Sequence, residues 1–207
     1  ISSGGAIYNL YKSEPNITNC SFIKNSTTNN GGAIANQEAN PNLTNCTFSG
    51  NHSYNSGGFD NYYGNPVFSS CVFSNNTAER FGGAMQNYFG NIKFRNCIFS
   101  GNISKYSGGA LFNIGGIFIF INCTATGNSA GYFGLFAYNK PFKFPPNLFL
   151  PSRMDFLNCI IWNDENAILN EDGSTIHINY SSVQNGLLAI HDLQQGLSWG
   201  NGNNDSD

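Results

Sequence analysis

The feature of this sequence that most limits its possible folds is an internal repeat of about 26 residues. Each unit opens with a glycine pair or an equivalent turn, and the six openings are GGAIYN at 4–9, GGAIAN at 31–36, GGFDNY at 57–62, GGAMQN at 82–87, GGALFN at 108–113 and GLFAYN at 134–139. A second motif, Asn-Cys or Ser-Cys followed by a short apolar stretch, recurs once in each unit. Two independent motifs that share one period indicate a solenoid built from stacked units.

Each unit contains a pattern that predicts three short strands separated by turns rich in Asn, Gly, Ser and Pro. In the first unit these strands are GGAIYN, PNITN and CSFIK. Strands this short cannot bury a core alone, but each can pair with its copy about 4.8 Å away in the next coil. We therefore expect an all-β, single-stranded parallel β-helix that forms one domain over residues 1–207. It should have about seven coils and be part of a longer solenoid.

Equivalent residues of stacked coils should form ladders. The apolar positions three before and two after each cysteine are expected to point inward, and they are Ile17, Leu43, Phe68, Phe94, Phe120 and Phe156, then Phe22, Phe48, Phe73, Phe99, Ala125 and Ile161. A turn position five after the cysteine is occupied by Asn25, Asn51, Asn76, Asn102 and Asn128. Asn tolerates a left-handed bend, and its amide both donates and accepts hydrogen bonds, so we expect a structural asparagine ladder.

The six cysteines occupy one position of the repeat: Cys20, Cys46, Cys71, Cys97, Cys123 and Cys159. They should therefore stack in parallel with their side chains pointing inward together. Parallel neighbours about 4.8 Å apart hold their Cβ atoms slightly beyond the usual reach of a disulfide. We expect buried free thiols. The spacings between the cysteines also match no zinc-binding signature.

The GGAI and FxxN motifs, such as GGAI at 31–34 and FSGN at 48–51, resemble the repeats of polymorphic outer-membrane proteins and related bacterial surface proteins. These repeats are a form of the pectate-lyase-like right-handed β-helix. The resemblance covers Gly4 to Val183, with six recognisable coils and a degenerate seventh at IHINYSSV. It implies a right-handed helix. It implies no single activity, because this fold carries polysaccharide lyases, hydrolases, adhesins and inert stalks.

The repeat is interrupted by about ten extra residues between the fifth and sixth cysteines, around KPFKFPPNLFLP at 140–151. Nearby, IFIFIN at 117–122 loses the alternation of apolar and polar residues, which leaves Ile119 and Ile121 on the outer face. We expect this inserted loop to fold back over that face as a lid, through Phe142, Phe144, Leu148 and Phe149. The alternative is an aromatic lip over a ligand groove or a docking surface.

Charged residues are scattered. Phe59 and Asp60 replace the usual small-apolar pair in the third coil, and repeat arithmetic makes Glu79 and Arg80 the nearest candidate partners of Asp60. Lys93 and Arg95 should lie on the outer face of a second strand, where the adjacent positions Val67, Ser69, Ile119 and Ile121 supply no carboxylate. Polysaccharide lyases and hydrolases need clustered charge. These five charged residues are therefore weak catalytic candidates, and the sequence favours a protein that is not an enzyme.

Metal and cofactor sites are not predicted. His52, His177 and His191 fall in different coils and at different positions of the repeat, so they should not share a metal. Asp205 and Asp207, in the ending GNGNNDSD, could contribute to a calcium site if the chain continued.

Aromatic residues gather in the turns on both sides of the Gly-Gly strand. On the approach these residues are Tyr54, Phe81, Tyr106, Tyr132 and Phe133, and on the exit they are Tyr11, Tyr63, Tyr88 and Phe89. Rings on adjacent coils can form a stacking strip for sugar rings or for another protein. They can equally stack on one another and shield the edges of the coils. The sequence leaves both readings open.

Composition restricts the possible partners. Charged residues make up 10% of the chain, against about 25% in an average protein, and the net charge is −3 with no Lys/Arg cluster. Nucleic acid and anionic membranes are thus disfavoured, and no apolar stretch reaches the roughly 18 residues of a membrane helix. We expect a secreted or cell-surface structural or adhesive module whose partner is a surface glycan, a protein or further copies of itself. The alternative is a polysaccharide-active enzyme or a carbohydrate-binding module.

Overall fold

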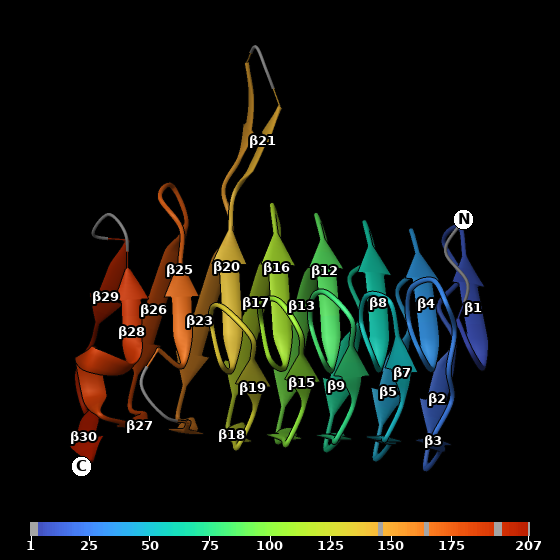
Figure 1. Ribbon diagram of the computed structural model, residues 1–207, viewed down its shortest axis with the longest axis horizontal. Helices are drawn as coiled ribbons and strands as arrows, with labels where there is room; N and C mark the ends of the chain where they lie inside the picture. Colours follow the sequence, from blue (N-terminus) through green and yellow to red (C-terminus); the bar gives the residue numbers. More distant parts are fainter. Residues whose placement is uncertain (1–3, 145–146, 164–165, 193–195, 207) are drawn as a thin grey trace.

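The computed structural model is a parallel β-solenoid, and it describes residues 4–144, 147–163, 166–192 and 196–206. Its coils stack along the longest axis of the molecule, with the first and last coils at opposite ends (Figure 1). Each coil contributes one strand to each of three long parallel sheets.

Sheet 1 holds the strands that follow the glycine pairs: β1 (Ile7–Leu10), β4 (Ile34–Gln37), β8 (Phe59–Tyr62), β12 (Met85–Tyr88), β16 (Leu111–Ile114), β20 (Ala137–Lys140), β25 (Ile168–Asn170) and β28 (Ile190–Asp192). Sheet 2 holds β2 (Asn16–Thr18), β5 (Asn42–Thr44), β9 (Val67–Ser69), β13 (Asn91–Arg95), β17 (Ile117–Ile121), β23 (Arg153–Leu157), β26 (Thr175–Asn179) and β29 (Leu197–Trp199). Sheet 3 holds β3 (Ser21–Ile23), β6 (Thr47–Ser49), β10 (Val72–Ser74), β14 (Ile98–Ser100), β18 (Thr124–Thr126), β24 (Ile160–Trp162), β27 (Ser182–Gln184) and β30 (Asn204–Ser206). Eight strands per sheet correspond to seven turns between the first and last strands, which confirms the predicted solenoid.

Smaller elements complete the chain. Sheet 4 is short and consists of β7 (His52–Ser53), β11 (Thr77–Ala78), β15 (Ile103–Ser104) and β19 (Ser129–Ala130). A 3₁₀ helix, η1 (Gly186–Ala189), lies between β27 and β28. The strands β21 (Phe142–Phe144) and β22 (Leu148–Leu150) pair with each other in antiparallel fashion.

The core consists of the predicted apolar ladders. The rings of Phe48 and Phe73 stack at 4.7 Å with an interplanar angle of 7°, and the rings of Phe120 and Phe156 stack at 4.6 Å and 4°. These separations match the spacing of about 4.8 Å between adjacent strands. Each ring therefore packs directly on its copy in the next coil, which holds the strands in register.

The asparagine ladder is confirmed. The Nδ2 of Asn76 donates to the Oδ1 of Asn102 at 2.9 Å and to the backbone oxygen of Phe48 at 2.9 Å. The same two bonds recur at Asn51 and Asn102, and all three side chains are buried. The side-chain amides thus satisfy backbone groups that the tight turn leaves unpaired. A second ladder, which the sequence analysis did not identify, follows sheet 1 through Asn36, Asn61, Asn87, Asn113, Asn139 and Asn170.

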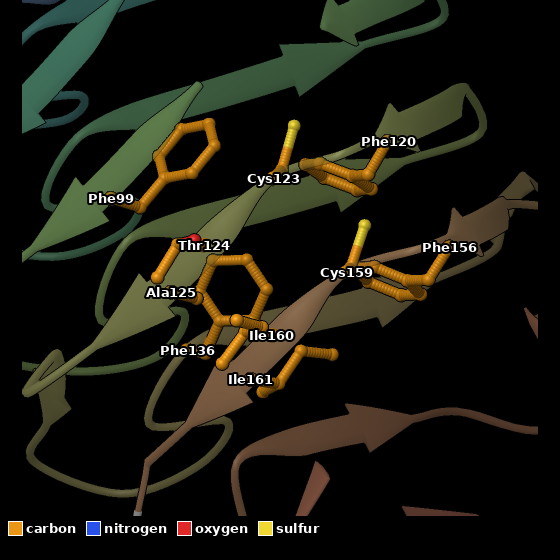
Figure 2. Close-up of a pocket in the computed structure, with 10 residues that line it drawn as sticks. All are labelled: Phe99, Phe120, Cys123, Thr124, Ala125, Phe136, Phe156, Cys159, Ile160 and Ile161. Carbon is orange, nitrogen blue, oxygen red and sulfur yellow. The ribbon is translucent and has the colours of Figure 1, made fainter. Parts of the chain in front are cut away.

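The cysteines are free thiols, and all except Cys20 are buried. Cys123 and Cys159 directly precede the adjacent strands β18 and β24, and their sulfur atoms point the same way (Figure 2). Sulfur donates to the backbone oxygen two residues earlier, as from Cys97 to Arg95 at 3.3 Å. Burial raises the pKa of the Cys46 thiol. The cysteines therefore act as small, weakly polar core residues.

The inserted segment differs from the expected lid. It forms the hairpin β21–β22, which projects beyond the edge of the coils (Figure 1). Phe142 packs on Phe89 at 4.8 Å, whereas Phe144, Leu148 and Phe149 are largely exposed. The two strands of the hairpin pair with each other, so their backbone hydrogen bonds form without contact with the surface of the solenoid. Ile119 and Ile121 stay partly exposed for the same reason.

The outer face of sheet 1 is also buried from β4 to β25, so the burial of Asp60 is compatible with an outward direction. Phe59 lies in the core, so Asp60 faces outward at a position equivalent to Ala35 and Gln86. Further along this row, Phe112 and Tyr138 form a small second cluster with Ile114 and Leu169. Turns on both edges of sheet 1 cover this face.

Candidate functional site

Two aromatic rims border sheet 1, and they contain the predicted ligand-binding residues. The approach rim lies in the turns before the glycine pairs and contains Tyr54, Phe81, Tyr106 and Tyr132. The exit rim lies at the ends of the sheet 1 strands: Tyr88 is the last residue of β12, and Tyr11, Tyr63 and Phe89 are in the turns that follow. Every one of these positions is on or next to the outer surface, but the two rims differ in how much ring area they expose.

The approach rim keeps several rings half-exposed. Tyr106 and Tyr132 lie 4.9 Å apart, and Tyr54 is beneath the guanidinium of Arg80 at 5.8 Å. Tyr54, Tyr106 and Tyr132 all remain exposed. Phe81 differs, because it stacks on Phe112 at 4.4 Å and covers sheet 1. The exposed rings on this side of sheet 1 are therefore these three tyrosines and Phe133, which lies beside Tyr132.

The exit rim is largely packed on itself. Tyr63 and Phe89 stack at 4.7 Å, and Phe89 also contacts Phe142 of the hairpin. Burial raises the pKa of Tyr88. Tyr11 and Tyr63 are nevertheless exposed, Tyr63 as much as Tyr106 of the approach rim. Ring contacts therefore favour the packing interpretation for Tyr88 and Phe89.

A polar groove of about 580 Å³ lies beside the approach rim, lined by Ser26, Thr27, Thr28, His52, Tyr54 and Glu79. The carboxylate of Glu79 accepts a hydrogen bond from Lys105 and lies 3.7 Å from the Nε2 of His52. The hydrogen bond from Lys105 keeps the pKa of Glu79 below its ordinary value. Glu79 is thus an ionised acceptor at neutral pH.

The sequence did not predict this grouping. His52 was expected to be isolated, and Glu79 was expected to lie near Asp60. The available signal was repeat phase, because HSY at 52–54, TAE at 77–79 and ISK at 103–105 are equivalent segments. Side chains two residues apart on a strand share a face. Aligning these segments brings His52, Glu79 and Lys105 onto one surface.

The structure does not pair Asp60 with Glu79 or Arg80. The hydroxyl of Ser56 donates to Asp60 at 3.0 Å, and burial raises the pKa of Asp60 to about 7. Arg80 lies over the rings of Tyr54 and Phe81 instead. Asp60 is 3% exposed, so a substrate has no direct route to it.

The remaining charged candidates are dispersed. Lys93 pairs with Val67 and Ile119, and Arg95 pairs with Ser69 and Ile121, so no carboxylate is adjacent to them on the sheet. Among the described residues, no three His, Cys, Asp or Glu side chains lie close enough together to hold a metal ion. Asp205 lies in β30, and Asp207 is outside the described residues, so the calcium site stays a prediction. No helix in the described part of the chain is long and apolar enough to cross a membrane.

Comparison with known families agrees with this geometry. A model of the right-handed β-helix region matches residues 1–103, and a model of the Chlamydia polymorphic membrane protein repeat matches residues 96–114. The chain is therefore a right-handed parallel β-helix. The segment 96–114 is similar to the polymorphic membrane protein repeat. Searches of curated proteins and of solved structures found no match.

Proposed function

We propose that this chain is a non-enzymatic module of a secreted or cell-surface protein, which presents its approach rim to a surface glycan or protein. The repeat family that it resembles is named for a membrane protein of Chlamydia, which supports a place at a cell surface. The observation that carries the adhesive role is the set of exposed approach-rim tyrosines on a rigid solenoid: Tyr106 and Tyr132 at equivalent positions of adjacent coils, and Tyr54 two coils before Tyr106.

Rigidity makes exposed rings effective in binding. Tyr54, Tyr106 and Tyr132 each lie in a turn between a short strand of sheet 4 and a strand of sheet 1, and these strands pair with neighbouring coils, so little conformational entropy is lost when a partner binds. Tyrosine supplies a large apolar face together with a hydroxyl group, a combination enriched in protein interfaces. The pair Tyr106 and Tyr132, at a spacing of one coil, suits partners that are themselves repetitive, such as glycan chains or further copies of this protein.

A polysaccharide-active enzyme is the alternative. The raised pKa of Asp60 suits a general acid, but Asp60 is buried and accepts a hydrogen bond from Ser56. Glycoside hydrolysis generally needs two carboxylates about 5–10 Å apart on either side of the substrate. The groove beside the approach rim has one carboxylate among its lining residues, Glu79. The geometry therefore favours binding over catalysis.

The experiment that separates these functions is a glycan-array screen of the purified chain with calcium present, run with an ultraviolet assay for unsaturated sugar products. Binding without product supports the adhesive module. The variant Tyr106→Ala/Tyr132→Ala should then lose much of the binding, whereas the exit-rim variant Tyr88→Ala should keep it. Product formation would overturn the proposal and make Asp60, Glu79, Arg80, Lys93 and Arg95 the first residues to replace.

A further inference from the structure

The polar groove beside the approach rim has the chemistry of a carbohydrate subsite. We propose that the surface formed by His52, Tyr54, Glu79 and Lys105 binds one neutral pyranose ring of a glycan. This inference rests on the proposed adhesive function and adds to it a ligand class and a location.

The repeat itself builds this surface. Thr77 pairs with His52 on the adjacent strand. Further along, the backbone N–H of Glu79 donates to the backbone oxygen of Ser53, and that of Lys105 donates to the backbone oxygen of Ala78. This register places Tyr54, Glu79 and Lys105 at equivalent positions of three consecutive coils. Because neighbouring strands lie about 4.8 Å apart, the ring, the carboxylate and the ammonium form a row about two strand spacings long. A sugar ring is of similar size.

Tyr54 supplies the stacking face. Its side chain is 47% exposed and lines the groove, and the guanidinium of Arg80 lies 5.8 Å from its ring centroid. The Arg80 contact restrains the ring, which lowers the entropy lost on binding. The face of a pyranose carries C–H groups with a partial positive charge, which match the negative face of an aromatic ring.

Glu79 and Lys105 supply the polar contacts. One carboxylate oxygen of Glu79 accepts from Lys105, and the other is 3.7 Å from the Nε2 of His52, which is longer than an ordinary hydrogen bond. That second oxygen is therefore available to a sugar hydroxyl. The Nδ1 of His52 lies 2.9 Å from the hydroxyl of Thr77, which fixes the orientation of the imidazole. A charged acceptor makes stronger hydrogen bonds than a neutral one.

The charges and the shape of the groove select the class of ligand. The negative charge of Glu79 is matched by Lys105, so the surface favours neither an acidic nor a basic sugar. The lining includes the residues Ser26, Thr27 and Thr28, which suit a partner with many hydroxyl groups rather than an apolar peptide. The groove volume of about 580 Å³ lies within the roughly 300–1,000 Å³ of small-molecule sites.

The test is protein-observed NMR with saturation transfer, using the methyl glycosides of glucose, galactose, mannose and N-acetylglucosamine as probes. At least one probe should shift the Cε1–H signal of His52 and receive saturation on one ring face. Tyr54→Ala and Glu79→Gln should each weaken that binding about tenfold, because each removes one of the main contacts. Tyr180→Ala, which alters an exposed tyrosine outside both rims, is the matched control and should bind as the unaltered protein does.

Two results would overturn the inference. Neither tests the adhesive function, which the glycan array tests separately. In the first, a probe binds but neither Tyr54→Ala nor Glu79→Gln weakens it, which would place the sugar elsewhere. In the second, no probe shifts His52 or receives saturation, which would exclude a neutral pyranose subsite. Circular dichroism of each variant establishes that the fold is intact, which is expected because Tyr54 and Glu79 are outside the core.

Discussion

Phe136 fills the space that Ala125 leaves in the phenylalanine ladder of sheet 3. Ala125 pairs with Phe99 and Ile161, whereas Phe136 takes the position that a small residue such as Ala110 holds in other coils. The Phe136 ring lies 5.9 Å from that of Phe99, beside Ala125 (Figure 2). No space for a water molecule remains between these side chains. In this coil, the large side chain is thus Phe136, at a position that is small in other coils, and the small side chain is Ala125, at a position of the phenylalanine ladder.

This exchange predicts strong coupling between the two positions. Phe136→Ala should lower the free energy of unfolding by about 3–5 kcal/mol, because it opens a cavity in the core. Ala125→Phe should cost about 1–3 kcal/mol through overpacking. The variant Ala125→Phe/Phe136→Ala should cost clearly less than the sum of the two, since the new ring occupies the vacated space. Urea unfolding of the three variants measures this, and additive costs would contradict the account.

The buried asparagine ladder should contribute to stability through its hydrogen bonds. Asn76→Ala removes the amide that bonds to Phe48 and Asn102 and leaves buried polar atoms unpaired. Each unsatisfied group costs about 1–3 kcal/mol. Urea unfolding should show a loss of this size or greater. The control Asn91→Ala, at an exposed position, should change stability by less than about 0.5 kcal/mol. Equal effects at both positions would show that the ladder is not stabilising.

The raised pKa of Asp60 predicts that the free energy of unfolding falls as the pH rises. Burial raises its pKa from 3.8 to about 7, so the folded state binds a proton that the unfolded state has lost over this interval. The contribution of Asp60 is complete below about pH 4 and is lost as the pH rises through 7. Asp60→Asn, which is always neutral, should flatten this part of the stability profile, whereas Asp172→Asn at an exposed site should not. Urea midpoints between pH 4 and 8 measure the effect. An unchanged slope in Asp60→Asn would refute the assignment.

The cysteine ladder predicts six thiols of very unequal reactivity. In the folded protein only Cys20 is exposed, so a thiol reagent should label one group quickly and the other five slowly. In urea without reductant all six should react at once. Cys20→Ser should abolish the fast phase and leave five thiols on unfolding. A total below six in the unaltered protein would indicate a disulfide and contradict the structure.

The solenoid could be predicted because its causes are local and repeated. The glycine pairs, the Asn-Cys turns and the apolar positions flanking Cys46 or Cys71 recur at one period, and only stacked coils bury them together. The same reasoning predicted the Asn76 ladder and the outward direction of Lys93 and Arg95. An alignment of the repeats would also have placed Tyr54, Glu79 and Lys105 at equivalent positions, but Glu79 was predicted to lie near Asp60 instead.

Only the tertiary structure decided the features that depend on how turns fold over the sheets. The sequence could not orient Asp60, because both faces of sheet 1 are buried and the usual alternation is absent. Nor could it show that the arms around Phe142 and Phe149 pair with each other, since a hairpin and a lid bury similar residues. The sequence by itself determined the coil, its ladders and its register, because each follows from a repeated local pattern. The site, the hairpin and the buried carboxyl arise from departures from that pattern, whose contacts are set by packing between different coils.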